Sequence, residues 1–259
     1  MRLLWTALVC SIFPAVAAEQ PFTGTWKIDL AKAQLSKKPD KIEIANGMYK
    51  CLSCDPPIAI KADGSDQPLT GHPGYNSVSV RIVDDHVIET IAKQDGKIVS
   101  EEKTTVSPDG AVSTIEFIGH PPASDKPVTG HFTAKRTGKA PAGMHIASGA
   151  WVPEKFENIT ENALMTTFDQ TADGLKMTAA TGDHYDAKFD GKEYALEGSQ
   201  QADKVILKRL GPREIQETDK RGGKVVSTTR MTVSADGKSM TMVNRDRQGR
   251  VTTLVWDKQ

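Results

Sequence analysis

The sequence has no excess of either charge. Lysine plus arginine and aspartate plus glutamate number 33 each among the 259 residues, so the formal net charge is zero. Basic residues are not clustered, and a neutral chain of this kind lacks the electrostatic footprint by which proteins bind nucleic acids or anionic membranes. We therefore predict neither nucleic acid nor an anionic membrane surface as a partner.

Long apolar runs are also missing, except at the N-terminus. There Arg2 precedes an apolar run of about a dozen residues, which is shorter than a transmembrane helix needs. Small residues follow at Ala15–Ala18. This pattern predicts a secretory signal peptide over residues 1–18, cleaved after Ala17 or Ala18, and a periplasmic or secreted product without a transmembrane segment. A lipoprotein anchored through Cys10 is the alternative.

Cysteine is scarce, with only three residues in the chain. Cys51 and Cys54 remain after cleavage, and in an oxidising compartment we expect two cysteines at this separation to form a structural disulfide across a tight turn. Two alternatives stay open: a redox pair of the thioredoxin type, and a metal site that would need two further ligands. Asp55 follows the second cysteine where covalent haem attachment needs histidine.

Motifs of metal and hydrolytic chemistry are absent from the sequence. None of the six histidines forms an HxH or HxxxH pair, and no Gly-x-Ser-x-Gly segment is present. We therefore predict no metal, no cofactor and no catalytic residue, and we keep enzymatic activity as an alternative only.

An internal repeat is the strongest positive signal. Lys61–Phe117 aligns without a gap to Lys188–Asn244, and 18 of the 57 aligned pairs are identical. A second match, at an offset of 125, relates Phe22–Ile28 to Ser148–Val152. The repeat predicts two domains, over residues 19–136 and 149–259, joined by a linker over residues 137–148.

Both copies read as short strands joined by tight turns. Aromatics make up only 6% of the chain, whereas the frequent Thr, Val, Gly and Asp suit strands and turns. Asp95-Gly96 and Gly222-Gly223 are two-residue hairpin signals between segments of alternating polarity. Leu30–Leu35 favours one helical turn. The sequential order predicts an all-β meander, and closure of each copy into an up-and-down antiparallel barrel removes its exposed edges.

The ends of each copy carry a further pattern, a Gly-x-Trp on the first strand and a basic residue on the last. These residues are Gly24, Trp26 and Lys135-Arg136 in the first copy, and Gly149, Trp151 and Lys258 in the second. The chain resembles a tandem of lipocalin-like domains, similar to a group of exported bacterial proteins of uncharacterised function. The resemblance implies that the basic side chain of each copy lies over the indole of the same copy and closes one end of that barrel.

Four residues are candidates for a site. His72 and Tyr75 lie in a loop that differs between the copies. Residues alike in both copies serve the shared fold, so residues found in only one copy are the better candidates for a function. His184 and Tyr185 belong to a polar segment that can titrate. Our first hypothesis is a non-enzymatic binding protein that holds a small hydrophobic molecule in a barrel cavity, with these four residues as ligand-binding candidates. The alternatives are a ligand-free envelope interaction or structural protein, and a barrel isomerase- or cyclase-like enzyme.

Overall fold

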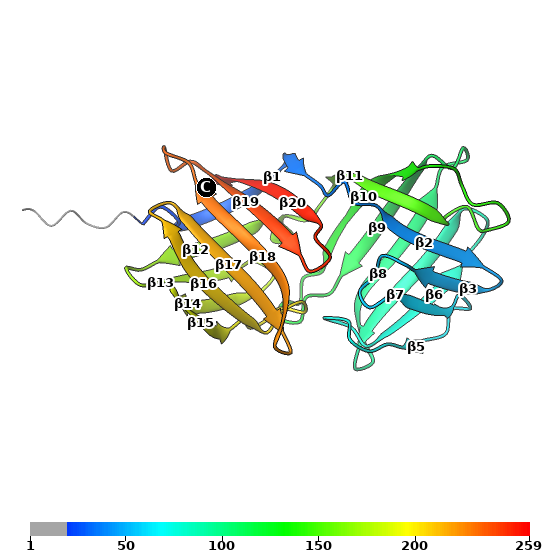
Figure 1. Cartoon of the computed structure of the whole chain (residues 1–259), viewed down its shortest axis with the longest axis horizontal. Coiled ribbons are helices and arrows are strands. Elements are labelled where there is room, and N and C mark those ends of the chain that lie inside the picture. The colour runs from blue at the N-terminus through cyan, green and yellow to red at the C-terminus, as the bar shows by residue number, and fades with distance from the viewer. Residues whose placement is uncertain (1–19) are drawn as a thin grey trace, which may run out of the picture.

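The computed structural model describes residues 20–259, and the predicted signal peptide and Cys10 lie outside them. The described chain contains twenty β-strands and one short 3-10 helix, η1 (Glu161–Ala163). No helix in this part of the chain is long and apolar enough to cross a membrane. The strands form two ten-stranded antiparallel sheets, each a nearly closed barrel (Figure 1). The predicted all-β class and the tandem of up-and-down barrels are confirmed, consistent with a lipocalin-like fold.

One barrel, which we name the inserted barrel, is a continuous stretch of chain. Its strand order is β4-β3-β2-β11-β10-β9-β8-β7-β6-β5. The strands are β2 (Asp40–Ala45), β3 (Met48–Cys51), β4 (Ile58–Lys61), β5 (Gln67–Pro68), β6 (Ser77–Ile82), β7 (Val87–Gln94), β8 (Lys97–Val106), β9 (Val112–Gly119), β10 (Val128–Thr137) and β11 (Gly149–Glu157).

The other barrel, which we name the split barrel, combines the first strand of the chain with its C-terminal part. Its order is β14-β13-β12-β1-β20-β19-β18-β17-β16-β15. The strands are β1 (Gly24–Gln34), β12 (Met165–Gln170), β13 (Gly174–Ala179), β14 (His184–Lys188), β15 (Asp190–Ala195), β16 (Lys204–Gly211), β17 (Glu214–Arg221), β18 (Lys224–Val233), β19 (Ser239–Asp246) and β20 (Val251–Lys258).

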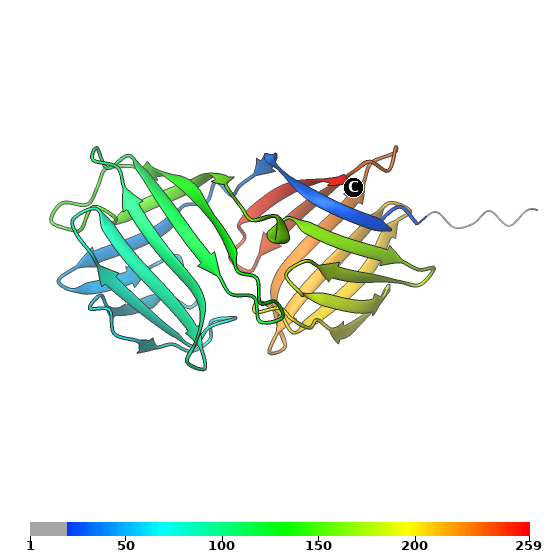
Figure 2. The same ribbon diagram turned by 180° about the vertical axis from the view of Figure 1, so that it is seen from behind.

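The two barrels therefore exchange the first strands of the two sequence copies. β1 pairs with β12 and β20 in the split barrel, while β11, its counterpart in the second copy, pairs with β2 and β10 in the inserted barrel. Figure 2 shows β1, in blue, crossing the split barrel beside the C-terminal strands. Both strands carry the Gly-x-Trp pattern, so the repeat alone does not reveal which barrel each strand completes.

The exchange divides the chain differently from the ranges that the repeat predicts. The barrels comprise residues 40–157, and residues 24–34 with 165–258, instead of residues 19–136 and 149–259. Residues 137–148, predicted as the linker between domains, connect β10 to β11 within the inserted barrel. The chain passes between the barrels twice, at residues 35–39 and at residues 158–164.

Each barrel is plugged at one end by a tryptophan and a basic side chain. Trp26 is fully buried and donates a hydrogen bond to the Phe22 carbonyl, 2.8 Å away. Lys258 Nζ lies 5.3 Å from the centre of that indole. Gly24 has a φ of +136°, and a Cβ there would stand 2.6 Å from Lys258 Cε. The positive φ of this position favours glycine, and the missing Cβ leaves room for the basic side chain.

The inserted barrel has the matching plug at Trp151. The Arg136 guanidinium lies 4.1 Å from the centre of the Trp151 ring, and it donates hydrogen bonds to the carbonyls of Ile146 and Ser148. The resemblance implied that each cap forms within its own copy. The structure corrects this: Arg136 of copy one caps Trp151 of copy two, and Lys258 caps Trp26, because the strands that carry the tryptophans are exchanged.

Local turn chemistry follows the sequence in most places. Asp95-Gly96 and Gly222-Gly223 form the predicted two-residue turns, and all four residues have positive φ. The strands on either side of each turn pair directly. The helical turn predicted over Leu30–Leu35 is wrong, because β1 continues to Gln34 and pairs with β20 across a register shift.

Candidate functional site

A cleft of about 400 Å³, open to solvent, lies between the two barrels. One wall comes from the inserted barrel, from the start of β2, the loop after β3 and the loop before β6. The other wall comes from β18, β19 and the β19–β20 turn of the split barrel. The lining residues are Asp40, Ser53, Cys54, Asp55, His72, Pro73, Tyr75, Gln201, Val226, Ser227, Asn244, Asp246, Arg247, Gln248 and Arg250.

A disulfide supports the wall on the inserted barrel. Cys51 and Cys54 are bonded, with their Cα atoms 5.4 Å apart, which confirms the predicted bridge. Cys51 ends β3 and is buried in the barrel core, whereas Cys54 is partly exposed at the cleft. The Ser53 hydroxyl between them accepts a hydrogen bond from the Lys41 amide at 2.9 Å. The bridge therefore ties the cleft wall to the end of β3.

His72 and Tyr75 form an aromatic pair on the same wall. Their rings stack with centroids 5.1 Å apart and planes 18° from parallel. The Tyr75 hydroxyl lies 3.1 Å from His72 Nδ1. Burial, and then the positive charge of Arg247, lower the pKa of His72. The imidazole is therefore neutral at neutral pH, and its tautomer sets which of the two groups donates in the hydrogen bond between Nδ1 and the Tyr75 hydroxyl.

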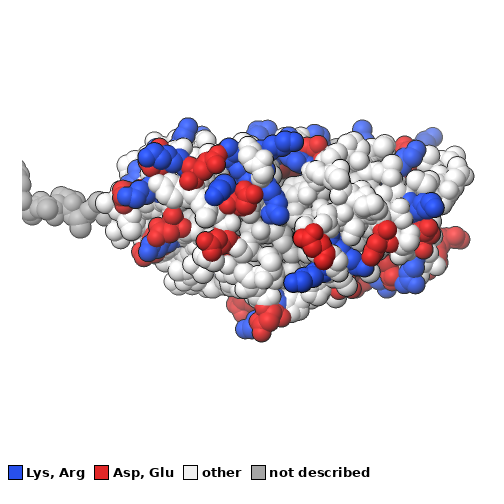
Figure 3. Space-filling view, turned by 90° about the horizontal axis from the view of Figure 1, so that it is seen from below, with Lys and Arg blue, Asp and Glu red and all other residues white. Residues whose placement is uncertain are grey.

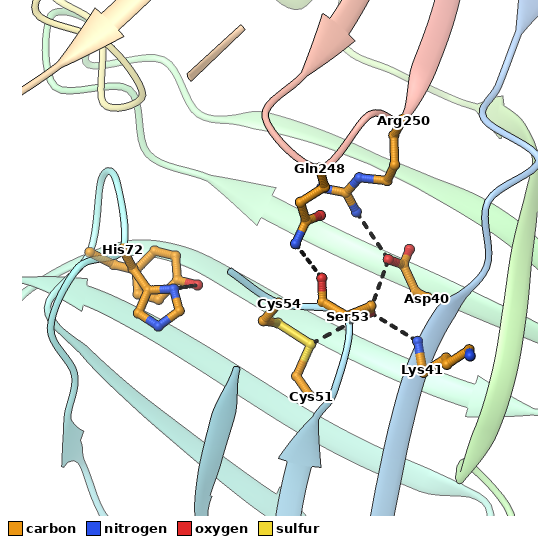
Figure 4. Close-up of a disulfide and its surroundings, with 9 residues drawn as sticks. Asp40, Lys41, Cys51, Ser53, Cys54, His72, Gln248 and Arg250 are labelled. Carbon is orange, nitrogen blue, oxygen red and sulfur yellow. Dashed lines mark hydrogen bonds and ion pairs between the residues drawn. A yellow bond between two sulfur atoms is a disulfide. The ribbon is translucent and has the colours of Figure 1, made fainter. Parts of the chain in front are cut away.

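Ion pairs and hydrogen bonds join the two walls (Figure 4). The β19–β20 turn reaches across, so that Arg250 Nη1 lies 3.0 Å from Asp40 Oδ1 and Arg247 Nε lies 2.9 Å from Asp55 Oδ2. The side-chain amide of Gln248 donates to the Ser53 carbonyl. Asp246 holds this turn in shape, because its carboxylate accepts from the Arg250 side chain at 2.6 Å and from two backbone amides of the turn.

A chain of polar side chains runs from the cleft into the split barrel. Ser227, on the cleft wall, donates a hydrogen bond to Asp219 Oδ2 at 2.7 Å. Asp219 and Glu217 share the inward face of β17 with Ile215, which is buried in the core. At the inner end, the buried Tyr185 donates to Glu217 Oε2 at 2.5 Å. Two carboxyl groups therefore stand side by side inside the barrel.

Burial controls the protonation of this chain. It raises the pKa of Glu217 to about 8, helped by the negative charge of Asp219 and opposed by the Tyr185 hydrogen bond. Burial also raises the pKa of Asp219, and it raises that of Tyr185 well above the ordinary value. Glu217 is therefore mostly protonated at neutral pH. Oδ1 of Asp219 is buried and finds no hydrogen-bond partner among residues 20–259.

The acid pair is peculiar to the split barrel. The residues 127 positions earlier, Thr90 and Ala92, are not acidic. The inserted barrel instead carries Glu102 on the inward face of β8, two residues along that face from Thr104 and four from the buried Val106. Glu102 is exposed to solvent, whereas Glu217 and Asp219 are at least half-buried, so the inserted barrel has no counterpart of the acid pair at this position of the repeat.

The structure separates the four candidate residues of the sequence. His72 and Tyr75 lie together at the cleft, and Tyr185 lies inside the split barrel. Neighbouring residues of a strand point to opposite faces of the sheet, so His184 is exposed where Tyr185 is buried. The His184 Nε2 atom lies 3.5 Å from Glu197 Oε2. No group of three or more metal-ligating side chains is found over residues 20–259.

Sequence reasoning missed Ser227, Glu217 and Asp219. The signal that points to the acids is their spacing from Ile215, which puts them on the apolar face of an alternating strand, together with their absence from copy one. The polar appearance of the segment concealed this, because acidic residues in a strand usually mark a solvated face.

No model of a known protein family matches the chain, and no curated protein matches its sequence. On the face shown in Figure 3, acidic and basic side chains are interspersed, as the equal numbers of both signs allow.

Proposed function

We propose that the protein is an exported binding protein that holds one small amphipathic molecule in the cleft between its two barrels. The observation that carries the proposal is the cleft itself, since its volume of about 400 Å³ falls within the range of about 300–1,000 Å³ typical of small-molecule sites. Export is supported by the N-terminal signal sequence pattern and by the disulfide.

The lining supports a ligand with one apolar and one polar part. Tyr75, Pro73 and Val226 offer apolar surface, and the stacked ring of His72 extends it. Ser227 and Asn244 offer a hydroxyl and an amide on the opposite wall. Polar groups at fixed positions beside apolar surface are what orients a ligand in a small-molecule site.

The amphipathic fluorophore 1-anilinonaphthalene-8-sulfonate tests the proposal. We expect one site per chain, and we expect Val226→Trp, which fills the cleft, to weaken binding at least about tenfold, or 1.4 kcal/mol. Val225→Trp is the matched control, because Val225 is exposed and does not line the cleft. Fluorescence titration of both variants, with circular dichroism to verify folding, provides the measurement. Equal binding by wild type and Val226→Trp would remove the cleft as the site.

Proton transfer is a second candidate, favoured by one specific observation. Glu217 is a carboxyl group whose pKa is raised by burial and by the negative charge of Asp219, and Ser227 on the cleft wall donates a hydrogen bond to Asp219. A general acid or base with a pKa near the working pH is what an isomerase- or cyclase-like reaction needs. The candidate requires that Glu217 holds its proton at neutral pH, so a carboxyl that titrates in its ordinary range would exclude it.

A further inference from the structure

We propose that the Cys51–Cys54 disulfide is a redox-sensitive clasp that holds the cleft wall of the inserted barrel against the split barrel. The proposal concerns the protein without ligand, so it does not depend on the proposed function. We define the clasp as the loop Cys51–Asp55 together with the turn Asp246–Arg250 on the opposite barrel.

The clasp is made of contacts whose geometry the disulfide fixes. Within the four residues that the bridge spans, the Ser53 carbonyl accepts from Gln248, and the Ser53 hydroxyl contacts Asp40 Oδ1 at 3.3 Å. Asp55, the next residue along the chain, pairs with Arg247. Figure 4 shows the Gln248 side chain directed from its turn toward Ser53 of this loop, and the Arg250 side chain directed toward Asp40 at the start of β2.

The split barrel holds its part of the clasp in shape without the disulfide. Asp246 binds its own turn through the backbone amides of residues 248 and 250 and through the Arg250 guanidinium. The loop of the inserted barrel is tied to β2 by hydrogen bonds from the Leu52 amide to the Lys41 carbonyl and from the Lys41 amide to the Ser53 hydroxyl, and the bridge is its covalent restraint. Opening the bridge leaves the loop held to β2 by hydrogen bonds alone, so the loop loosens while the opposite turn stays intact.

The two cysteine residues differ in exposure, which sets the course of reduction. Cys51 is 5% exposed, whereas Cys54 is partly exposed and lines the cleft. A thiolate of a dithiol reductant can thus reach Cys54 Sγ. It forms a mixed disulfide there, while the S–S bond breaks and its electron pair leaves on Cys51 Sγ, which lies 3.8 Å from the Ser53 hydroxyl.

The second thiol of the reductant completes the exchange. It attacks the mixed disulfide, releases Cys54 as a thiolate and leaves the reductant as a cyclic disulfide, so two electrons pass to the protein and both cysteines take up protons. The resulting free thiols no longer hold Ser53 at the cleft. The structure thereby couples the oxidation state of one bridge to the contact between the barrels.

Side-chain resonances of ¹⁵N-labelled full-length mature protein test the clasp. On reduction with dithiothreitol we expect the Gln248 Nε2–H and Arg247 Nε–H signals to shift, and their hydrogens to exchange with water at least about fivefold faster. The Arg136 Nε–H signal is the internal control, because that group binds the Gly110 carbonyl at the capped end of the inserted barrel.

The double variant Cys51→Ser/Cys54→Ser is the second arm. It should reproduce the reduced spectrum, and dithiothreitol should change it no further. If the bridge opens while the Gln248 and Arg247 signals stay unchanged, the clasp is refuted. A bridge that resists dithiothreitol in the folded protein would likewise overturn the proposal. Neither result bears on fluorophore binding, so the two proposals fail separately.

Discussion

Glu217→Gln is expected to stabilise the protein at alkaline pH by up to about 5 kcal/mol and to flatten the dependence of stability on pH. Glu217 has a pKa of about 8 in the folded protein, against an ordinary value of 4.5. A carboxyl group whose pKa is raised by folding contributes stability below about pH 4.5 and loses it as pH rises through 8. Each pH unit in that window is worth about 1.4 kcal/mol.

Glutamine keeps the hydrogen bond that the protonated acid makes, and it removes the free-energy cost of ionising a buried carboxyl group. Its carbonyl accepts the Tyr185 hydroxyl, and it has no charge to place beside Asp219. Urea unfolding of both proteins at pH 5 and pH 9 measures the effect. We expect the wild type to lose stability between these values and the variant to lose much less.

Glu214→Gln is the matched control on the same strand. Glu214 pairs with Arg230, and this hydrogen bond lowers the pKa of the Glu214 carboxyl. Its removal should cost little, because the pair lies at the surface and is screened by solvent, and it should give no gain in stability at alkaline pH. If the wild type and Glu217→Gln show the same change between pH 5 and pH 9, Glu217 is not a protonated buried acid.

Trp26→Ala and Trp151→Ala are expected to weaken different barrels, each in the half of the chain that does not contain the substitution. Truncating a buried tryptophan costs about 3–5 kcal/mol. Trp26 is buried in the core of the split barrel with Phe168, Leu175 and Met240, whereas Trp151 packs in the inserted barrel with Ile44 and Val106.

Hydrogen exchange resolved by peptide measures which barrel opens. Trp26→Ala should speed exchange chiefly within residues 165–258, and Trp151→Ala chiefly within residues 40–137. Each variant is the control for the other, since the chemistry of the change is the same. Faster exchange of residues 40–137 in Trp26→Ala, with residues 165–258 unaffected, would show that each copy folds on its own first strand.

Local features of the fold could be predicted from the sequence because they depend on neighbouring residues. Asp95-Gly96 specifies its hairpin because residues that tolerate positive φ stand between two alternating segments. Asn46-Gly47 carries the same signal, and both residues have positive φ in the structure, so that turn was also open to prediction. The barrel ends were recognisable for a similar reason, since Gly24 and Trp26 stand two residues apart on one strand.

Features that depend on distant pairing could not be predicted in this way. β1 and β11 both carry the Gly-x-Trp pattern, so the repeat does not determine which of them pairs with β20 and which pairs with β10. The cleft arises only because the chain crosses between the barrels twice and brings the disulfide loop against the β19–β20 turn. His72 and Tyr75 could be selected as peculiar to one copy, but their partners on the opposite wall could not.

A cross-link between β1 and β12 tests the exchange of strands most directly. Thr25 and Thr167 are paired residues of these strands, and their hydroxyl oxygens lie 2.9 Å apart. Mild oxidation of monomeric Thr25→Cys/Thr167→Cys should give a disulfide between the peptides that contain these two positions, with Cys51–Cys54 intact. Thr25→Cys/Lys41→Cys is the control, because Lys41 pairs with Ala150, the counterpart of Thr25 in the second copy. A bridge in the control pair, and none between residues 25 and 167, would contradict the exchange on which the cleft depends.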